Sequence, residues 1–451
     1  MTVLSDHALP EGQPFATVNG RRGQVGELLG SGGQGEVYAV SLAGTAFALK
    51  WYHPHYIEAD EDLRVRLERA VRRGAPTEDF LWPLDLAEVP GRSGFGYIMP
   101  LRQSNFTSIQ DIIAPPPRRL DLSLPTRADV CMKLANNFLE LHASGFCYQD
   151  INFGNIFLDP DSARILICDN DNVNIDGADA SIYGTRKFMA PEVVRREMLP
   201  NSRTDLFSMA VLFFYTFFGW HPLDGRREQE VRVMNAAAEN RLYGTEPLFL
   251  FDPNNDENGP VEGDHDWLVA RWNSLPDRLK ALFVRAFTIG LHDPAARVLE
   301  TEWRGPLGMI ATATVGCPDC GFEHVIDRRD ATPVATEKCL CCGEPMVFPL
   351  VISSGDSLTT LGLGRELSLA TSVSANVDDP MARVEPHPKH PDLLGLRNLS
   401  EESWRVAFDD GSAHRVDPGK AVRIAPGVTI ETMHGIARME TVCTVLSELA
   451  T

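Results

Sequence analysis

The stretch of sequence that decides the fold runs Cys147-Tyr148-Gln149-Asp150-Ile151-Asn152-Phe153-Gly154-Asn155-Ile156-Phe157-Leu158. An apolar, helix-like segment precedes it, and its last three residues have the character of a strand. Between the two, Asp150 and Asn155 stand in D-x-x-x-x-N spacing. An aspartate at the start of such a loop can accept the proton of a hydroxyl, and an asparagine carbonyl oxygen can hold a divalent ion. Alone, this spacing favours a plain polar turn, so the choice between such a turn and a functional loop depends on the other motifs.

The composition limits the classes of protein that fit the chain. With 451 residues we expect roughly two to four domains, and 43% apolar with 23% charged residues is typical of folded cores. A net charge of -20 argues against nucleic acid as the main partner. The amino terminus lacks the features of a signal peptide, and the longest apolar run, Met209 to Trp220, is too short to span a bilayer. We therefore expect a cytoplasmic protein with no membrane partner.

A glycine-rich segment lies near the amino terminus and reads Gly30-Ser31-Gly32-Gly33-Gln34-Gly35-Glu36-Val37. Its pattern is G-x-G-x-x-G-x-V between strand-like flanks, whereas a dinucleotide-binding fold would place a helix directly after the third glycine. Absent side chains let backbone N–H groups approach phosphates closely, and a plain hairpin turn is the alternative. The next apolar strand, Ala46 to Trp51, carries Lys50 near its end.

A buried strand after the D-x-x-x-x-N loop, Ile165 to Cys168, leads into Asp169-Asn170-Asp171. A carboxylate at this strand end would supply a second metal ligand. Asp169 is the preferred ligand, and Asp171 is a close alternative. Without Asp150 and Asn155, an acidic turn that caps a hairpin would be the default interpretation.

Later motifs complete an ordered series. They are Gly184-Thr185-Arg186-Lys187-Phe188-Met189-Ala190-Pro191-Glu192, Thr204 to Ala210, Gly219-Trp220-His221-Pro222-Leu223 and His292-Asp293-Pro294-Ala295-Ala296-Arg297. Together with the earlier motifs, the series resembles the protein kinase family over about residues 20–305. This resemblance implies a bilobal kinase fold, ATP and Mg²⁺ (or Mn²⁺) as cofactors, and transfer of the γ-phosphate to Ser or Thr of a protein substrate.

The resemblance also assigns roles to single residues. Asp150 would be the catalytic proton acceptor, and Asn155 and Asp169 would hold Mg²⁺. Lys50 would contact the α- and β-phosphates, and Glu192 would pair with Arg297. The implied ATP-binding residues are Gly30, Ser31, Gly32, Gly33, Gln34, Gly35, Val37, Ala48, Lys50, Met99, Pro100 and Arg102.

A helical segment from Ala59 to Arg73 follows the lysine strand. Glu68 lies in the middle of this segment, at about the distance that the family uses, and is the carboxylate expected to pair with Lys50. Glu58 and Glu61 are rivals, and a solvated glutamate is the structural alternative.

The rest of the predicted small lobe and the hinge comprise two short segments, Phe80 to Pro83 and Gly96 to Leu101. A hinge must offer adenine one carbonyl and, two residues later, one N–H. Pro100 keeps its carbonyl and fits there, and Met99 would lie at the back of the pocket. A helix is predicted over Arg127 to His142.

Three departures from the family bear on mechanism, and one of them is Asn170-Asp171 in place of the usual Phe-Gly. Tyr148-Gln149 replaces the usual His-Arg, whose arginine binds a phosphate on the activation segment, so we expect activity without that phosphorylation. Ser181, Tyr183 and Thr185 are the hydroxyls of that segment. Asn152 replaces a lysine that touches the γ-phosphate, and Arg186 or Lys187 is the hypothetical substitute cation.

Nine cysteines divide into two groups. Cys131, Cys147, Cys168 and Cys443 stand among apolar neighbours, as buried free thiols do. The others form two C-x-x-C-G knuckles, which predict a structural zinc site with Cys341 left over, against the alternative of a redox pair or a coincidence. The zinc ligands would be Cys317, Cys320, Cys339 and Cys342.

Short alternating segments follow the knuckles and predict an all-β sandwich. Gly364-Arg365-Glu366 and the later Leu396 to Ser400 resemble a forkhead-associated domain, which binds phosphothreonine. Arg365 matches the phosphate-binding arginine, but Asp378 and Asp379 would repel a phosphate. The alternative is a β domain that docks on the kinase or on a partner protein.

The predicted fold class is therefore multidomain α+β: a bilobal kinase fold, a small zinc ribbon and an all-β sandwich. The expected limits are residues 1–310, with a small lobe at about 15–100 and a large lobe at about 103–310, then 311–350 and 351–451. This order resembles bacterial kinases of tellurite-resistance and stress gene clusters. A pseudokinase scaffold is the first alternative function, and a small-molecule kinase is the second.

Overall fold

The protein was studied as a computed structural model that describes residues 8–178, 183–327, 338–346, 348–354, 357–367, 369 and 380–441. The chain divides into two compact units of mixed helices and strands. The first comprises Met1–Leu122, Lys133–Gly259 and Val284–Thr301, and the second comprises Ser123–Met132, Pro260–Phe283 and Glu302–Thr451. Helix α11 (Glu300–Ala313) runs through the expected boundary at residue 310, and the domain limits stay a prediction.

The first unit begins with a closed antiparallel barrel in the strand order β1-β2-β3-β4-β6-β5. Its strands are β1 (Pro14–Thr17), β2 (Arg22–Ser31), β3 (Gly35–Leu42), β4 (Thr45–Tyr52), β5 (Asp85–Glu88) and β6 (Gly96–Pro100). Alternate side chains point inward and form one apolar core, which includes Phe15, Val25, Val40, Leu49 and Ile98. The glycine-rich segment forms the turn between β2 and β3, as its flanks predict.

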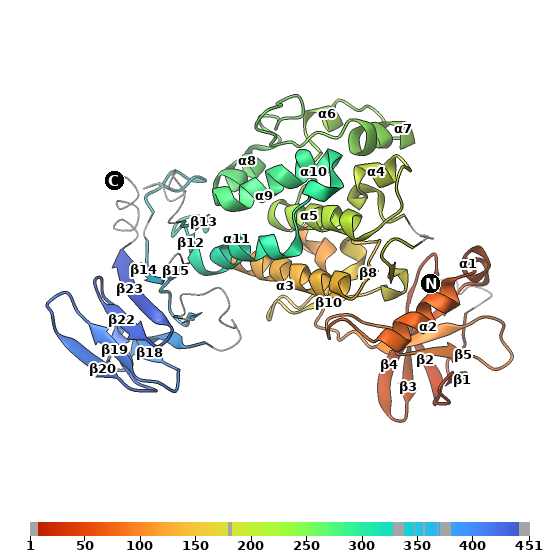
Figure 1. Cartoon of the computed structure of the whole chain (residues 1–451), viewed down its shortest axis with the longest axis horizontal. Helices are drawn as coiled ribbons and strands as arrows, with labels where there is room; N and C mark the ends of the chain where they lie inside the picture. Colours follow the sequence, from red (N-terminus) through yellow and green to blue (C-terminus); the bar gives the residue numbers. More distant parts are fainter. Residues whose placement is uncertain are drawn as a thin grey trace. The chain divides into compact units, whose positions relative to one another are not determined.

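Two short helices, α1 (Pro54–Ala59) and α2 (Leu63–Arg73), follow β4 where one helical segment is predicted. Helix α2 packs through Leu63 and Leu67 against strands of the barrel (Figure 1). Asp60, which lies between the helices, is buried and accepts two hydrogen bonds from Arg66, at 2.8 and 2.6 Å. This local ion pair explains why the helical pattern is interrupted.

The segment Phe80–Pro83 is not a strand of the barrel. Phe80 forms an isolated parallel bridge with Ile167, and the Leu81 N–H donates to the Ile167 carbonyl at 2.9 Å. Pro83 has no N–H to give to a sheet ladder, so the regular strand starts only at Asp85. The prediction placed this strand a few residues too early.

Helices dominate the rest of the first unit: the part of α3 (Leu124–Ala143) from Lys133 onward, α4 (Pro191–Val194), α5 (Ser202–Phe218), α6 (Arg226–Gln229), α7 (Ala236–Asn240) and α10 (Ile289–His292). Helix α5 is buried from Thr204 to Phe218. Asn201 and Thr204 form a capping box at its start, and Gly219 ends it in the left-handed conformation. Among the described residues, no helix combines the length and apolar character needed to cross a bilayer.

Two small sheets hold the loops that carry the polar motifs. One has the order β10-β9-β7, with β7 (Thr107–Ser108), β9 (Ile156–Leu158) and β10 (Ile165–Ile167). The other pairs β8 (Phe146–Cys147) with β11 (Asn174–Ile175). The D-x-x-x-x-N loop therefore lies between β8 and β9, and Asp169 follows β10.

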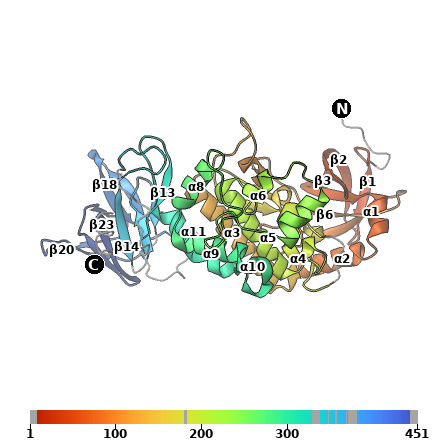
Figure 2. The same cartoon turned by 90° about the horizontal axis from the view of Figure 1, so that it is seen from above.

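The second unit contains α8 (Asp266–Asn273), most of α9 (Asp277–Phe287), most of α11 and the hairpin of β12 (Thr314–Gly316) with β13 (Glu323–Val325). It ends in two antiparallel sheets, drawn in blue in Figure 2, with orders β15-β14-β23-β22-β19-β20 and β16-β17-β18-β21. Both sheets bury side chains in one core, which includes Val384, Leu396, Trp404, Ile430 and Met439.

The strands of these two sheets are short and follow each other closely. They are β14 (Leu350–Ser354), β15 (Ser357–Thr360), β16 (Glu366–Leu367), β17 (Ala382–His387), β18 (His390–Asn398), β19 (Trp404–Ala407), β20 (Ala413–Val416), β21 (Ala421–Arg423), β22 (Thr429–Thr432) and β23 (Gly435–Thr441). Asp378, Asp379 and Cys443, which enter the sequence-based predictions, lie outside the described residues.

Candidate functional site

Strand β4 carries Lys50 into the interior, where the residue is only 4% exposed. Its ammonium lies 2.8 Å from Asp171 Oδ2 and 3.4 Å from Asp169 Oδ1. It also donates to Gln34 Oε1 at 2.6 Å, which brings the glycine-rich turn to the same point. The structure thus joins three segments that the sequence analysis selected separately.

The charges of Lys50 and Asp171 stabilise each other. Burial opposes the charge on Lys50, but the Asp171 and Asp169 carboxylates outweigh burial and raise the pKa of Lys50 above its ordinary value. Burial alone would raise the pKa of Asp171, but Lys50 and the hydrogen bonds from Lys50 and Tyr52 lower it. We expect both groups to be charged at neutral pH.

The expected pair of Lys50 with Glu68 does not form. Glu68 Oε1 lies 3.3 Å from Arg64 Nε in an exposed pair on the outer side of helix α2. The rivals Glu58 and Glu61 are exposed as well. The inward positions of α2 hold Leu63, Arg66, Leu67 and Ala70, so this helix presents no carboxylate to the lysine.

The D-x-x-x-x-N loop is folded back on itself by its two asparagines. Asn155 Nδ2 donates to the Asp150 carbonyl at 2.9 Å and lies 3.4 Å from Asp150 Oδ2. Asn152 Nδ2 donates to the same carbonyl at 3.0 Å, and its Oδ1 accepts from the Gly154 N–H at 2.7 Å. Asn152 thus has a structural role in the loop that its position in the sequence did not reveal.

This loop is tied to the segment that carries Asp169. The Cys168 N–H donates to the Asn155 carbonyl at 2.8 Å, and the Tyr148 hydroxyl donates to the Cys168 carbonyl. Gln149 and Asp169 both adopt positive φ angles, 73° and 48°, which non-glycine residues seldom do. At these two places the surrounding contacts hold the loop and the segment that begins at Asp169 in an uncommon backbone conformation.

The carboxylate of Asp205 on helix α5 holds the D-x-x-x-x-N loop in place. Its carboxylate accepts hydrogen bonds from the Tyr148 N–H at 2.5 Å and the Gln149 N–H at 3.0 Å. His142, near the end of helix α3, contacts Asp205 at 3.1 Å and also contacts Glu300. The sequence motif that begins at Thr204 therefore positions the loop.

His142 predicts a measurable dependence of stability on pH. Burial lowers the pKa of His142, but hydrogen bonds to Asp205 and Glu300 outweigh burial and raise it to about 9. Because the folded-state pKa is raised, this contribution is fully present below about pH 6.5 and is lost as pH rises toward 9. The contribution of His142 to the free energy of unfolding is at most about 3 kcal/mol.

We therefore expect the wild-type chain to lose stability between pH 6.5 and 9 more steeply than a His142→Gln variant. Denaturant-induced unfolding at several pH values measures this difference. The free energy of unfolding of each chain is taken from the first transition of its unfolding curve. Parallel pH profiles would contradict the assignment.

The activation-segment region contacts both the loop and the buried helix. Thr185 Oγ1 donates to Asp150 Oδ1 at 2.8 Å, and Gly184, with φ 94°, lies so close to Gln149 that a Cβ would meet its carbonyl at 2.8 Å. The predicted pair of Glu192 with Arg297 is confirmed, with 2.8 Å between Oε2 and NH2 in a buried position. Ser181 lies outside the described residues.

The hypothesis that Arg186 or Lys187 replaces the missing loop lysine is not supported. Lys187 Nζ lies 2.7 Å from Asp224 Oδ2, and Arg186 pairs with Glu239. Both cations are therefore neutralised by carboxylates of the large lobe, which the sequence pattern did not reveal.

The predicted nucleotide pocket has an apolar lining. Ala48 pairs with Met99 across strands β4 and β6, and both pack in one cluster with Val37 and Leu166. Leu166, on β10, was not predicted, although its place just before Asp169 could have suggested it. Pro100 ends strand β6, as expected for a hinge. Arg102 stacks on Phe157 at 4.0 Å and donates to the Phe106 carbonyl.

Three glycines of the glycine-rich turn have open space at the Cβ position. In the described structure, no atom lies within 4 Å of a Cβ placed on Gly30, Gly32 or Gly33. By contrast, a Cβ on Gly35 would meet the Trp51 carbonyl at 2.3 Å, so packing requires glycine there. Packing within the described part of the chain therefore does not require glycine at Gly30, Gly32 or Gly33. Ser31 ends strand β2 beside them.

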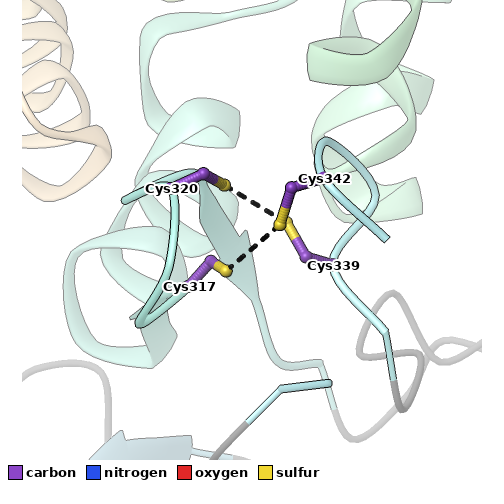
Figure 3. Close-up of side chains that lie close together, drawn as sticks. All are labelled: Cys317, Cys320, Cys339 and Cys342. Atoms are coloured by element: carbon purple, nitrogen blue, oxygen red, sulfur yellow. Dashed lines mark hydrogen bonds between the residues drawn. The ribbon is translucent and has the colours of Figure 1, made fainter. Parts of the chain in front are cut away.

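The four predicted zinc ligands come together in the second unit (Figure 3). The sulfurs of Cys317 and Cys342 are 3.7 Å apart, and those of Cys320 and Cys339 are 3.6 Å apart. A tetrahedral ion with Zn–S bonds of about 2.3 Å requires sulfurs about 3.8 Å apart. The donor set and its spacing therefore fit zinc, and all four positions would be filled by thiolates.

Local turns build each half of this cysteine cluster. Gly321 and Gly343 have φ angles of 73° and 76°, and their N–H groups donate to the carbonyls of Cys317 and Cys339. Cys341 is outside the cluster, as predicted. His324, fully buried on β13, places Nε2 3.4 Å from Cys339 Sγ. It was missed because its spacing matches no knuckle.

Arg365, the residue expected to bind a phosphate, is engaged within the second unit. Its guanidinium donates to the carbonyl of Ala311 in the last turn of helix α11. Burial lowers the pKa of Arg365. The contact gives this arginine a structural role, because it satisfies a carbonyl that the helix end leaves without a partner.

Comparisons with known proteins agree with this geometry. Serine/threonine-protein kinase pkn2 of Myxococcus xanthus is 27% identical over 309 residues, which cover 62% of this chain and 35% of that protein. CBL-interacting protein kinase 4 of Oryza sativa subsp. japonica is 26% identical over 268 residues, 54% of this chain and 57% of that protein. Serine/threonine-protein kinase SCH9 of Candida albicans is 32% identical over 182 residues, 34% of this chain and 22% of that protein.

The chain thus spans from under a quarter to little more than half of the length of these relatives. The family model described as "Protein kinase domain" matches residues 24–256. This match contains the glycine-rich turn, Lys50, the D-x-x-x-x-N loop and Asp169. Because it covers more than half of the 451 residues, the chain belongs to the protein kinase family.

Proposed function

We propose that the chain is an ATP- and Mg²⁺-dependent protein kinase that phosphorylates Ser or Thr of a protein substrate. The observation that carries the proposal is the convergence of Lys50, Asp169 and the Asp150–Asn155 loop at one place. Lys50 contacts Asp169, and the residue before Asp169 is hydrogen-bonded to Asn155. Phosphoryl transfer depends mainly on such positioning and on charge stabilisation.

Each residue has a definite task in this proposal. Lys50 binds the α- and β-phosphates, Asn155 and Asp169 hold Mg²⁺ or Mn²⁺, and Asp150 accepts the proton of the substrate hydroxyl. ATP supplies the phosphoryl group. Thr185 hydrogen-bonds to Asp150 and so orients its carboxylate toward an incoming hydroxyl. The first three glycines of the turn leave room for phosphates, and Ala48, Met99 and Pro100 would bind the adenine.

The proposal extends to the second unit. The cysteine cluster would hold a structural Zn²⁺, because four thiolates leave no open position for catalysis. The two sheets would bind a partner or phosphoprotein, although Arg365 already binds Ala311 and another residue would have to hold a phosphate. We place the protein in the bacterial cytoplasm, in signalling or the stress response, with no role for nucleic acid or membrane.

A host lysate incubated with Mg²⁺ and ATP tests the activity. The wild-type chain is expected to add phosphate to specific Ser or Thr sites, whereas Asp169→Asn should reduce the yield at least about 100-fold because a metal ligand is weakened. Phosphosite mass spectrometry provides the measurement. Equal site lists from both chains would contradict an enzymatic role.

A second candidate is a pseudokinase scaffold whose second unit assembles partners. Asn152 and the Asn170-Asp171 sequence, which replace common catalytic residues of the family, agree with it. Under this alternative the chain would bind ATP with Mg²⁺ but show no turnover, and Asp150→Asn would change nothing.

A further inference from the structure

Helix α2 cannot supply the carboxylate that keeps Lys50 in place. Its only acidic residue is Glu68, whose side chain is 43% exposed and paired with Arg64. Of the buried positions of this helix, only Arg66 is polar, and Asp60 holds it through two hydrogen bonds. Lys50 nevertheless is almost fully buried, and a buried ammonium without a partner would be strongly destabilising.

The carboxylate that contacts Lys50 belongs instead to Asp171. Its side chain is fully buried, and both oxygens contact Lys50 Nζ, at 3.1 and 2.8 Å. Tyr52 donates its hydroxyl to Oδ2 at 2.6 Å, and Tyr97 donates its hydroxyl to Oδ1 at 3.1 Å. A carboxylate has about four acceptor positions, and all of them are used here.

We propose that Asp171 is the positioning residue for Lys50 and replaces the helix carboxylate that other members of the family use. Tyr52 on β4 and Tyr97 on β6 hold Asp171 against the barrel. This inference rests on the proposed function, because it assigns the partner of a lysine that binds ATP. It also has a mechanistic consequence: Lys50 is placed by the metal-binding segment itself, so a movement of helix α2 would not switch the kinase on or off.

The same contacts distinguish the role of Asp169 from that of Asp171, which the sequence alone did not distinguish. The Asp169 side chain is 41% exposed and has one contact with Lys50, at 3.4 Å, so its oxygens remain accessible to a metal ion. Asp171 has no accessible oxygen. Asp169 is therefore the metal ligand, and Asp171 acts only through Lys50.

The two tyrosines are suited to this task. Burial, followed by the charge of Asp171, raises the pKa of Tyr52 and of Tyr97 well above the ordinary value. Both hydroxyls thus stay protonated and remain donors throughout the range in which the protein would work. They also fix the carboxylate from two neighbouring strands of one barrel.

Steady-state kinetics with varied ATP tests the inference. Asp171→Asn is expected to lower kcat/KM for ATP about 100-fold, and Asp171→Glu to recover part of the loss. Glu68→Gln is the matched control on helix α2 and should stay within about twofold of wild type. An equal loss in Glu68→Gln would overturn the proposal, as would an Asp171→Asn defect that excess Mg²⁺ fully restores, since that result would make Asp171 a metal ligand.

A double variant, Tyr52→Phe with Tyr97→Phe, covers the case in which Asp171→Asn does not fold. It keeps both rings and removes only the two hydroxyl donors. We expect kcat/KM for ATP to fall about tenfold. Unchanged kinetics in a folded double variant would contradict the proposal.

Amine labelling of Lys50, read by peptide mass spectrometry, separates this inference from the proposed function. In the wild-type chain Lys50 should label slowly, because it is buried and both Asp171 oxygens hold its Nζ in place. Asp171→Asn should speed labelling at least about tenfold, because Nζ is then released from this fixed position. Glu68→Gln should leave the rate unchanged. Labelling that is insensitive to Asp171 would sink the inference, whereas absence of turnover in wild type would sink only the kinase function.

Discussion

Replacement of Asp150 by asparagine is expected to reduce phosphoryl transfer about 1,000-fold or more while MgATP binding persists. An amide cannot accept the proton of the attacking hydroxyl, but it keeps the size of the side chain. The loop should stay intact, because Asn152 and Asn155 donate to the Asp150 backbone carbonyl and not mainly to its side chain. Single-turnover phosphorylation and nucleotide titration measure the two properties separately.

Asp161→Asn is a matched control for this experiment. Asp161 is an exposed aspartate in the turn after β9, and its backbone N–H donates to Asp159 Oδ1. Its replacement should leave transfer at the wild-type rate. Equal rates for Asp150→Asn and wild type would remove Asp150 from the chemistry and favour the scaffold alternative.

Loss of zinc is the second large effect that we expect. Structural zinc sites contribute on the order of 10 kcal/mol to the folding of small domains, so Cys339→Ser or a strong chelator should unfold the segment around β12 and β13. The purified wild-type chain should contain about one zinc per chain, in keeping with one four-thiolate site. Elemental analysis and thermal unfolding of the full chain provide the measurements.

Cys341→Ser separates this effect from a general sensitivity to cysteine loss. Cys341 is exposed, and its backbone N–H lies 3.4 Å from Cys339 Sγ. The variant should keep its zinc and its thermal stability. A wild-type chain without zinc, or a Cys341→Ser chain that loses it, would show that the knuckles do not form the predicted site.

The sequence was sufficient where the chemistry is carried by short, ordered motifs. Asp150 and Asn155 are five residues apart, and their spacing alone places them in one loop. The pair of Glu192 with Arg297 spans 105 positions, yet each residue lies in a motif of its own and could be matched through the family resemblance. The four clustered cysteines could be predicted from the spacing of the two C-x-x-C-G knuckles.

Prediction failed where a partner is chosen by packing in three dimensions. Glu68 was selected for its place along a helix, but the face that it occupies depends on where α2 starts, and Asp60 interrupts the helix before that point. Asp171 lies 121 positions from Lys50, and nothing local marks it as the partner. The ion pairs of Arg186 with Glu239 and of Lys187 with Asp224 could not be predicted for the same reason, because Glu239 and Asp224 come from distant segments.

The most direct test of the central claim is a crystal structure of the chain with Mg²⁺ and a non-hydrolysable ATP analogue. We predict that the triphosphate lies under the Gly30–Gly35 turn, with Lys50 on its α- and β-phosphates. The metal should bind Asn155 and Asp169, with Asp150 facing the γ-phosphate. A nucleotide bound elsewhere, or one bound here without Lys50 and Asp169 touching phosphate or metal, would contradict the account.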